Sequence, residues 1–281
     1  MITVLNSGIY STIQDLGRSS FANIGVPVSG AMDSYAAKIG NQLLHNKLED
    51  AVIEITFGGC KFRFEKDLKI CLSGANFSPK IDDKKVLMNS VLDVKKDAIL
   101  TFGRKVNGVR TYLSVQGGLL SESILKSKSF YKGITENFVL KKGDQLQVNL
   151  SKEIYRNTFS KIKIGENHFK AHTIACNRGP EFDLLSSEQK KRLIKKLFTI
   201  SNDNNRVGYR LEDVMENQLK PILTSGVLPG TVQLTPSGRL IVLMRDCQVT
   251  GGYPRVLQLT EEAINRLSQK GTNDIIQFVL K

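Results

Sequence analysis

The sequence has no tryptophan, only four cysteines and no long apolar run. A membrane-spanning helix needs about 18 to 20 consecutive apolar residues, and every apolar stretch here is shorter. The opening MITVLNSGIYSTIQDLG also lacks the basic stretch followed by an apolar one that a signal peptide has. We therefore expect no membrane association and a cytoplasmic protein that begins with a strand.

The cysteines share no CxxC spacing and are scattered along the chain: Cys60, Cys71, Cys176 and Cys247. This pattern predicts buried free thiols and argues against a zinc site or a disulfide framework. His168 and His172 are four residues apart, a spacing that brings two side chains together on a helix. Because ENHFKAHTI indicates a linker followed by a strand, we expect no metal site there.

Several catalytic signatures are absent. The sequence contains no GxxxxGKS or GxxxxGKT loop, no GxSxG and no HExxH. These absences argue against a Walker A nucleotide cradle, a serine-hydrolase elbow and a metalloprotease helix. An AMKM-type lysine motif is missing as well, so we expect no covalently bound biotin.

The formal net charge is +13, which raises the question of nucleic-acid binding. The lysines are spread along the chain, and short clusters such as KKRLIKK fall on a predicted amphipathic helix. No RNA-binding aromatic signature, zinc finger or basic zipper region accompanies them. We therefore interpret the charge as a solvated surface and expect no nucleic-acid partner.

Most of the chain consists of short apolar segments separated by Gly, Asn and Asp at spacings of about ten residues, as in a β-barrel or sandwich. With 281 residues, the chain has room for two barrels of roughly 130 residues each. Residues 52–64 alternate apolar and polar positions around Gly58-Gly59, which predicts a hairpin. Asn107-Gly108 predicts a type I′ turn. The fold class is therefore expected to be mainly β.

Three short helices are predicted from their capping residues. Asp33 precedes an apolar face as a candidate N-cap, and Ser186 with Gln189 has the capping-box spacing. The third helix is expected to start after Thr260 and to end at Gly271.

A weak internal repeat suggests two related halves, because RTYLSVQGG at residues 110–118 is echoed by MRDCQVTGG at residues 244–252. The polar stretch of residues 151–170 is the best place for a boundary. We expect one domain over residues 1–158 and another over residues 159–281, with room for the two barrels to exchange segments.

Polar and glycine residues are dense at residues 11–33. The candidates there are Asp15 as a catalytic carboxylate and, for binding, Gln14, Arg18, Ser29 and Gly30. The same residues could instead satisfy left-handed turns, caps and an ion pair, so both interpretations stay open.

The last third contains a second dense region, where arginine forks could bind carboxylate or phosphate. Asp246 is the second catalytic candidate. The binding candidates are Arg178, Arg206, Arg210, Gln233, Gln248, Gly251, Gly252 and Tyr253. A β-turn with an Asp cap would explain the segment around Asp246 equally well.

A series of segments over nearly the whole chain resembles the biotin-dependent carboxyltransferase, or allophanate hydrolase subunit 2, family, which includes the C subunit of 5-oxoprolinase. These segments are QDLGR, GVPVSGAMD, IEITFGG, YLSVQGG, NRGPEFD, RVGYRL, SGVLPGTVQLTPSG and DCQVTGGYP. The chain departs from the family pattern where LKSKS replaces a glycine-serine turn at residues 125–129. It also departs at Asn205, where relatives have Asp, and where KGTND replaces a PGD turn.

The resemblance implies two cyclophilin-like β-barrel domains with a few short helices. It implies one component of an ATP-dependent 5-oxoprolinase that cleaves 5-oxoproline to L-glutamate, with the B subunit of 5-oxoprolinase as direct partner and the A subunit completing the reaction. ATP, with or without Mg²⁺, would bind at a site shared with the partners, where the candidate loops meet in one basic pocket. Two other functions are open, because fold does not settle reaction. One is a regulatory partner of the B subunit, and the other is carboxyl transfer from biotin to urea or another amide.

Overall fold

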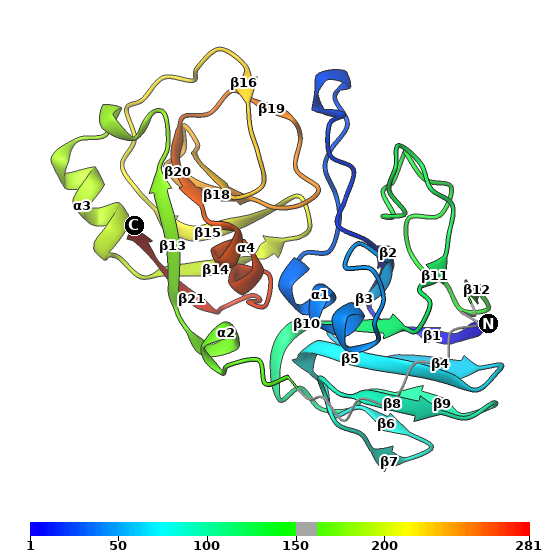
Figure 1. Ribbon diagram of the computed structural model, residues 1–281. Helices are drawn as coiled ribbons and strands as arrows, with labels where there is room; N and C mark the ends of the chain where they lie inside the picture. Colours follow the sequence, from blue (N-terminus) through cyan, green and yellow to red (C-terminus); the bar gives the residue numbers. More distant parts are fainter. Residues whose placement is uncertain (150–161) are drawn as a thin grey trace. The chain divides into compact units, whose positions relative to one another are not determined.

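A computed structural model describes residues 1–149 and 162–281 (Figure 1). The chain forms two compact units: unit 1 comprises Met1–Arg18 and Ser29–Phe169, and unit 2 comprises Ser19–Val28 and Lys170–Lys281. The chain therefore passes from one unit to the other three times, after Arg18, Val28 and Phe169. The predicted boundary between residues 158 and 159 lies outside the described residues.

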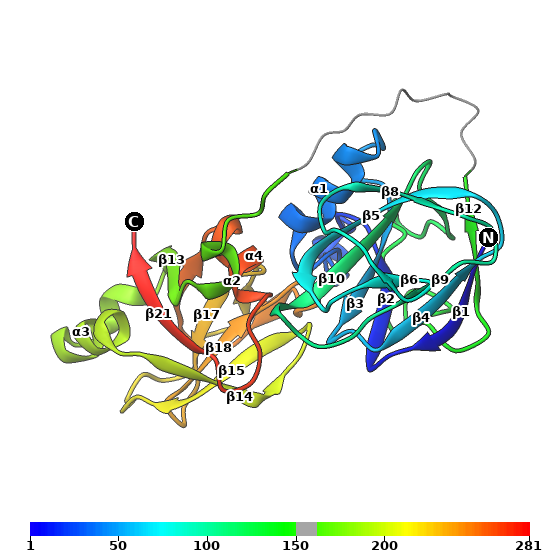
Figure 2. The same ribbon diagram turned by 90° about the horizontal axis from the view of Figure 1, so that it is seen from below.

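Unit 1 contains two antiparallel sheets. One has seven strands in the order β11-β12-β1-β4-β9-β6-β7, and the other has five in the order β2-β3-β10-β5-β8 (Figure 2). Their bounds are β1 Ile2–Ser7, β2 Tyr10–Gln14, β3 Val52–Thr56, β4 Cys60–Phe64, β5 Leu68–Asn76, β6 Lys80–Ile81, β7 Lys84–Lys85, β8 Val91–Val94, β9 Ile99–Thr101, β10 Asn107–Val115, β11 Leu119–Leu120 and β12 Gln145–Val148.

Side chains from both sheets of unit 1 form one apolar core. Its members include Ile2, Val4, Ile53, Ile55, Phe62, Phe64, Leu113 and Val115. Helix α1 (Ser34–Leu43) packs on β5 and β10, so the five-stranded sheet is buried on both faces. The Asp33 side chain accepts a hydrogen bond from the Ala36 amide at 3.0 Å, which confirms the predicted N-cap.

The predicted hairpin at residues 52–64 is wrong. Strand β3 pairs with β2 and β10, whereas β4 pairs with β1 and β9 in the other sheet. Phe57, Gly58 and Gly59 have φ values of 60°, 65° and 77°, and these left-handed residues carry the chain between the sheets. The alternation of apolar and polar residues is the same whether β3 and β4 pair with each other or with strands of different sheets. The sequence pattern therefore could not distinguish a hairpin from the observed arrangement.

The predicted type I′ turn at Asn107-Gly108 is also wrong, because this turn requires positive φ at both residues. Gly108 has φ 68°, but Asn107 is not in the left-handed region. Both residues begin β10, whose register against β5 shifts between Asn107 and Thr111. The Asn107 side chain accepts a hydrogen bond from the Asn76 amide at 3.0 Å and holds this bulged start in place.

Unit 2 contains a closed barrel in the order β13-β20-β17-β18-β15-β14-β21, in which only β13 and β21 pair in parallel (Figure 1). Its interior is apolar, with Ile174, Phe198, Tyr209, Val232, Leu257 and Phe278 all fully buried. The strands are β13 Thr173–Arg178, β14 Phe198–Asn204, β15 Gly208–Val214, β16 Ser225–Gly226, β17 Thr231–Leu234, β18 Arg239–Leu243, β19 Thr250–Gly251, β20 Arg255–Leu259 and β21 Ile275–Leu280. The mainly β prediction with few helices is confirmed.

The helical elements are short: 3₁₀ turns η1 Ala22–Ile24 and η2 Phe182–Leu184, and helices α2 Asn167–Lys170, α3 Ser187–Lys195 and α4 Glu261–Leu267. The capping box of Ser186 and Gln189 and the Thr260 cap are confirmed. The predicted stop at Gly271 is wrong, because α4 ends at Leu267. The Gly271 amide instead donates to the Asp274 side chain at 2.8 Å in the following turn.

All four cysteines are free and buried, as predicted. Burial raises the pKa of the Cys60 and Cys176 thiols to about 11 and that of Cys71 and Cys247 to about 12. Thiols with such pKa values stay protonated near neutral pH and are poor nucleophiles.

His168 lies on α2, where a linker was expected, while His172 follows that helix and bonds to the Ile275 carbonyl at 2.9 Å. Within residues 1–149 and 162–281, no three His, Cys, Asp or Glu side chains gather as a metal site would require. No helix of the same residues is long and apolar enough to cross a membrane.

The segment LKSKS forms a tight turn without glycine. Ile124 and Ser127 exchange backbone hydrogen bonds of 2.9 and 3.1 Å, and Leu125 and Lys126 between them have φ values of 51° and 61°. Two positive φ values in a two-residue loop define a type I′ geometry, which costs energy for side chains other than Gly, Asn or Asp. The turn places Ser127 and Ser129 beside the first candidate region.

Replacing Lys126 by Gly should relieve this backbone strain and raise the free energy of unfolding by about 0.5 to 1 kcal/mol. The matched control is Lys191→Gly on the exposed face of α3, where glycine should lower it by about 1 kcal/mol. Urea unfolding of both variants measures the difference. Equal losses in the two variants would contradict the strained turn.

Candidate functional site

Asp15 follows β2 and lies at the centre of a buried polar cluster in unit 1. Its carboxylate accepts hydrogen bonds from the Ser127 and Ser129 hydroxyls at 2.7 and 2.6 Å. The Lys128 and Gly17 amides add bonds of 2.6 and 2.7 Å. Charge-assisted bonds of this kind are the strong ones, so Asp15 ties the 127–129 segment to the end of β2.

Arg18 is 1% exposed, and its guanidinium points into unit 1. One NH group donates to the Ser29 hydroxyl at 3.0 Å and another to the Ser129 carbonyl at 2.5 Å. Residues 19–28 belong to unit 2, and Arg18 and Ser29 are the residues of unit 1 on either side of them. The hydrogen bond between Arg18 and Ser29 therefore joins the points at which the chain leaves unit 1 and re-enters it.

Residues 29–33 follow as a loop whose backbone is held at successive positions. The Ala31 amide donates to the Asp15 carbonyl at 2.8 Å, the Met32 amide to the Glu54 carboxylate at 2.8 Å, and the Asp33 amide to the Tyr112 hydroxyl at 2.7 Å. We call this arrangement the loop clamp, formed by Asp15, Arg18, Glu54 and Tyr112 around residues 29–33.

Gly30 is required within the loop clamp. Its φ is 92°, and a Cβ at this position would lie 2.8 Å from the Gly17 amide nitrogen and the Leu16 carbonyl carbon. Backbone atoms cannot yield as the end of a side chain can. Of the two interpretations left open for residues 11–33, turn geometry therefore explains Gly30 directly.

Further buried charges extend the loop clamp on the side of α1. The Tyr112 hydroxyl donates to Glu54 at 2.9 Å, Arg110 lies 3.7 Å from Glu54, and His168 contacts Asp33 at 2.7 Å. Burial, together with the carboxylates of Glu54 and Asp33, raises the pKa of Tyr112 well above its ordinary value. Tyr112 is therefore a neutral hydrogen-bonding group.

Sequence reasoning missed Glu54, Tyr112, Arg110 and His168 as members of this cluster. A signal was present for one of them, because Glu54 stands within VIEIT, a strand that is buried along its whole length. A carboxylate in such a strand needs buried partners. The positions of those partners depend on the pairing of β3 with β10, which strand patterning leaves open.

In unit 2, Arg206 and Asp246 form a bidentate pair. The guanidinium Nε and NH2 atoms lie 2.8 and 2.9 Å from the two carboxylate oxygens, and both side chains are nearly buried. Asn205 precedes this pair and accepts hydrogen bonds from the Val207 and Gly208 amides at 2.8 and 3.2 Å. Its amide oxygen therefore supports the turn at the position where the family pattern has Asp.

A second bidentate pair in unit 2 was not predicted. Arg255 donates to Glu181 at 2.9 Å from Nε and at 2.8 Å from NH2. A third donor of Arg255 reaches the Gly226 carbonyl at 3.0 Å. The hydrogen bonds from Arg255 lower the pKa of Glu181 below its ordinary value of 4.5.

The remaining candidate residues of unit 2 do not form one cluster. Gln233 is buried and donates to the Tyr253 carbonyl at 3.5 Å, and a Cβ on Gly251 would meet the Gln233 amide. Gly252 accepts a hydrogen bond from the Ile222 amide at 3.0 Å.

Three candidates at the surface of unit 2 lie apart from these contacts. Arg178 is exposed, with its guanidinium 5.2 Å from the Phe182 ring centroid. Arg210 pairs with Asp203 at 3.1 Å, and Gln248 is exposed.

The structure thus gathers the unit 1 candidates in one cluster and only some of the unit 2 candidates in separate contacts. In unit 1 it brings together Asp15, Arg18, Ser29 and Gly30, with Gln14 fully buried next to them and bonded to the Phe130 carbonyl at 3.3 Å. In unit 2 it joins Arg206 to Asp246 and Gln233 to Gly251 and Tyr253. The roles of these residues toward substrate or phosphate, and their meeting in one pocket, stay predictions.

The two catalytic candidates do not fit as magnesium ligands in this arrangement. Every oxygen of the Asp15 carboxylate accepts at least one amide or hydroxyl hydrogen bond, and both oxygens of Asp246 face the Arg206 guanidinium. A cation at either carboxylate would have to displace these donors. Neither carboxylate is therefore placed to hold a metal ion.

Residues 24–280 match the family described as carboxyltransferase domain, subdomain A and B, and the chain belongs to this family. It is 33% identical to the 5-oxoprolinase C subunit of Escherichia coli strain K12 over 99% of this chain and 91% of that protein. It is 32% identical to the Haemophilus influenzae protein of the same name, over 99% and 90%.

Larger proteins contain a similar region. The chain is 26% identical to urea amidolyase of Saccharomyces cerevisiae, over 99% of this chain and 16% of that protein. Among solved structures, the urea amidolyase of K. lactis superposes with a TM-score of 0.86 at 25% identity, covering 99% of this chain and 18% of that chain.

Replacing Asp15 by Asn should lower the free energy of unfolding by about 2 to 4 kcal/mol, because an amide NH₂ group would face N–H and O–H donors in a buried site. Chemical denaturation measures the loss. The control is Asp83→Asn in an exposed turn, where Asn tolerates the positive φ and the change should stay within about 0.5 kcal/mol. Similar small effects in both variants would show that the cluster around Asp15 is not a stabilising centre.

The Glu181–Arg255 pair predicts a pH-dependent contribution to stability. Because the folded pKa of Glu181 is lowered, its stabilisation is present above pH 4.5 and is lost as the pH falls through the lowered folded value. Glu181→Gln should therefore cost about 1 to 2 kcal/mol at neutral pH and almost nothing in strong acid. A difference between wild type and variant that is constant over this pH range would contradict the pair.

Proposed function

We propose that this chain is one component of an ATP-dependent 5-oxoprolinase and acts with the A and B subunits of that enzyme. The supporting observation is the share of each relative's length that the chain covers. The chain aligns with 91% of the E. coli 5-oxoprolinase C subunit but with only 16% of the S. cerevisiae urea amidolyase. A protein of similar size that shares a third of its residues with the C subunit along its length is expected to have the same role.

In the proposed reaction, 5-oxoproline, ATP and two molecules of water give glutamate, ADP and phosphate. The lactam is a resonance-stabilised amide, and transfer of the γ-phosphoryl group to its carbonyl oxygen would activate the carbon. Water then adds to that carbon, and the C–N bond breaks with a proton going to nitrogen, which leaves an acyl phosphate. A second water attacks the acyl carbon and phosphate leaves, so that the carbon becomes the side-chain carboxylate of glutamate. We propose that ATP and 5-oxoproline bind where this chain meets the B subunit.

The buried contacts suggest how the candidate residues take part. Asp15, Arg18 and Asp246 are engaged with protein groups, so we propose that they act as positioning residues that hold surface loops in place. Arg178 and Arg210 are exposed or half-exposed and can offer guanidinium donors to an anion. This division assigns anion binding to the surface arginines and rigidity to the buried pairs.

A second candidate function is carboxyl transfer from biotin to urea or another amide. It is favoured by the urea amidolyase and urea carboxylase structures, which superpose on this chain with TM-scores of 0.86. Such a reaction requires a biotin carboxylase and a biotin carrier as additional proteins.

The test uses the full chain purified together with its cognate A and B subunits. We expect glutamate release from 5-oxoproline that requires ATP and disappears when this chain is omitted. Parallel reactions with urea, a biotin carboxylase and a biotinylated carrier should show no carboxyl transfer. Tight binding to the B subunit without glutamate release would contradict the enzymatic role and support a regulatory one.

A further inference from the structure

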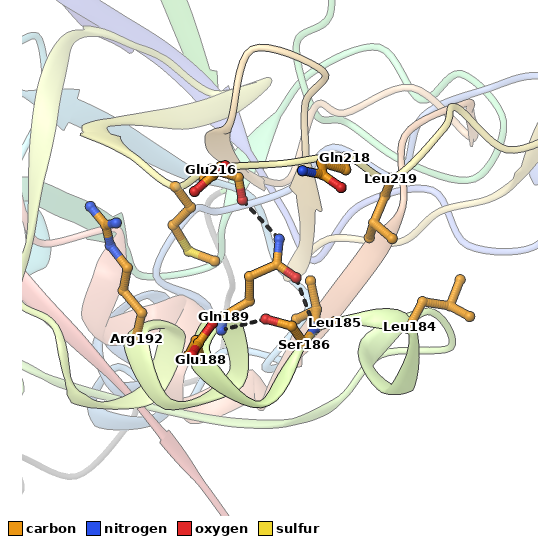
Figure 3. Close-up of a pocket in the computed structure, with 10 residues that line it drawn as sticks. Leu184, Leu185, Ser186, Glu188, Gln189, Arg192, Glu216, Gln218 and Leu219 are labelled. Atoms are coloured by element: carbon orange, nitrogen blue, oxygen red, sulfur yellow. Dashed lines mark hydrogen bonds between the residues drawn. The ribbon is translucent and has the colours of Figure 1, made fainter.

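A hollow of about 510 Å³ lies in unit 2, between the N-terminal half of α3 and the chain that follows β15 (Figure 3). Its volume falls within the roughly 300 to 1,000 Å³ of typical ligand pockets. None of the residues considered for 5-oxoproline or ATP lines it. The lining residues are Leu184, Leu185, Ser186, Glu188, Gln189, Arg192, Met215, Glu216, Gln218 and Leu219.

Hydrogen bonds fix both walls of the hollow. The Gln189 side chain accepts from the Ser186 amide at 2.8 Å and donates to the Glu216 carbonyl at 2.8 Å, so it joins the cap of α3 to the opposite wall. Arg192 donates to the Val214 carbonyl at 2.9 Å. The opposite wall is held again by Asn217, whose amide donates to the Thr235 carbonyl at 2.8 Å. The hollow is therefore preformed.

The lining differs in polarity from one end to the other. Figure 3 shows Leu184 and Leu219 at one end, Gln189 at the centre and Arg192 at the opposite end. Leu184 is 63% exposed and gives this end of the hollow an apolar surface.

The polar part of the lining has a net negative charge, although the whole chain has a net charge of +13. Glu188 and Glu216 contribute two carboxylates, and no ion pair within residues 1–149 and 162–281 neutralises them. Arg192 is the one cation of the lining. Gln218 is exposed, and in the described part of the chain neither its backbone nor its side chain makes a hydrogen bond.

We propose that this hollow binds a short basic segment of another polypeptide. An apolar side chain of the segment packs on Leu184 and Leu219, an arginine or lysine lies between Glu188 and Glu216, and the segment backbone bonds to Gln218. An acidic segment would be repelled by the two carboxylates, and a neutral one would leave them unused. This inference does not depend on the proposed enzymatic function.

The test is fluorescence anisotropy of the full chain with fluorescein-labelled peptides. The peptides contain one arginine and one leucine separated by one or two alanines, in both orders, and matched peptides contain glutamate in place of arginine. We expect binding of an arginine peptide that weakens as salt rises, because exposed charges are screened. The variant Glu188→Gln/Glu216→Gln should weaken this binding about tenfold.

Further variants separate the hollow from general surface effects. Leu184→Ser should weaken binding several-fold, because it removes apolar contact area. Glu212→Gln and Leu197→Ser change an exposed carboxylate and an exposed leucine elsewhere in unit 2 and should leave binding unchanged. Equal binding of the arginine and glutamate peptides, or no binding of any peptide at about 1 mM, would overturn the proposal.

Discussion

Unit 1 depends on the burial of the Asp15 carboxylate among N–H and O–H donors. A charged group removed from water is costly unless hydrogen bonds replace its hydration, and here amides and hydroxyls surround both carboxylate oxygens. The same residue accepts the Ala31 amide through its own carbonyl. Asp15 thus joins the end of β2 to the 127–129 segment and to residues 29–33.

This constraint explains why polar motifs that are distant in the sequence belong together. QDLGR supplies Asp15 and Arg18, IEITFGG supplies Glu54, and YLSVQGG supplies Tyr112, while GVPVSGAMD supplies the loop that they hold. Because the Ala31, Met32 and Asp33 amides each have a buried partner, the loop cannot shift by one residue without leaving buried groups unsatisfied. The loop clamp therefore keeps the backbone of residues 31–33 rigid.

In unit 2, arginine–carboxylate pairs hold loops in place as the loop clamp does in unit 1. Arg206 with Asp246 and Arg255 with Glu181 each form two parallel hydrogen bonds, a geometry that fixes orientation as well as distance. Both pairs join segments far apart in the chain, and Arg255 also donates to the Gly226 carbonyl of β16. Removing one partner of a pair would leave the charge of the other uncompensated. The pairs therefore fix the conformation of the barrel loops more than they add to net stability.

The sequence predicted the helix N-caps well, but it misplaced the turn at Asn107-Gly108 and the helix end at Gly271, and it predicted long-range pairing poorly. Asp33, Ser186 and Thr260 cap helices as expected, because a cap depends on residues within one turn. The hairpin at residues 52–64 was wrong, because alternation shows that β3 and β4 each have a buried face but not which strands they join. For the same reason the sequence indicated Asp15 and Arg18 as important but could not show that their partners are Ser127, Ser129 and Ser29.

Amide hydrogen exchange at residues 29–33 tests the loop clamp directly. The Ala31, Met32 and Asp33 amides should exchange as slowly as the core strands of unit 1, because each donates to a buried acceptor, while the exposed Ala22 and Asn23 amides should exchange rapidly. Rapid exchange of all five amides would show that the loop is not held and that the buried Asp15 cluster does not organise unit 1.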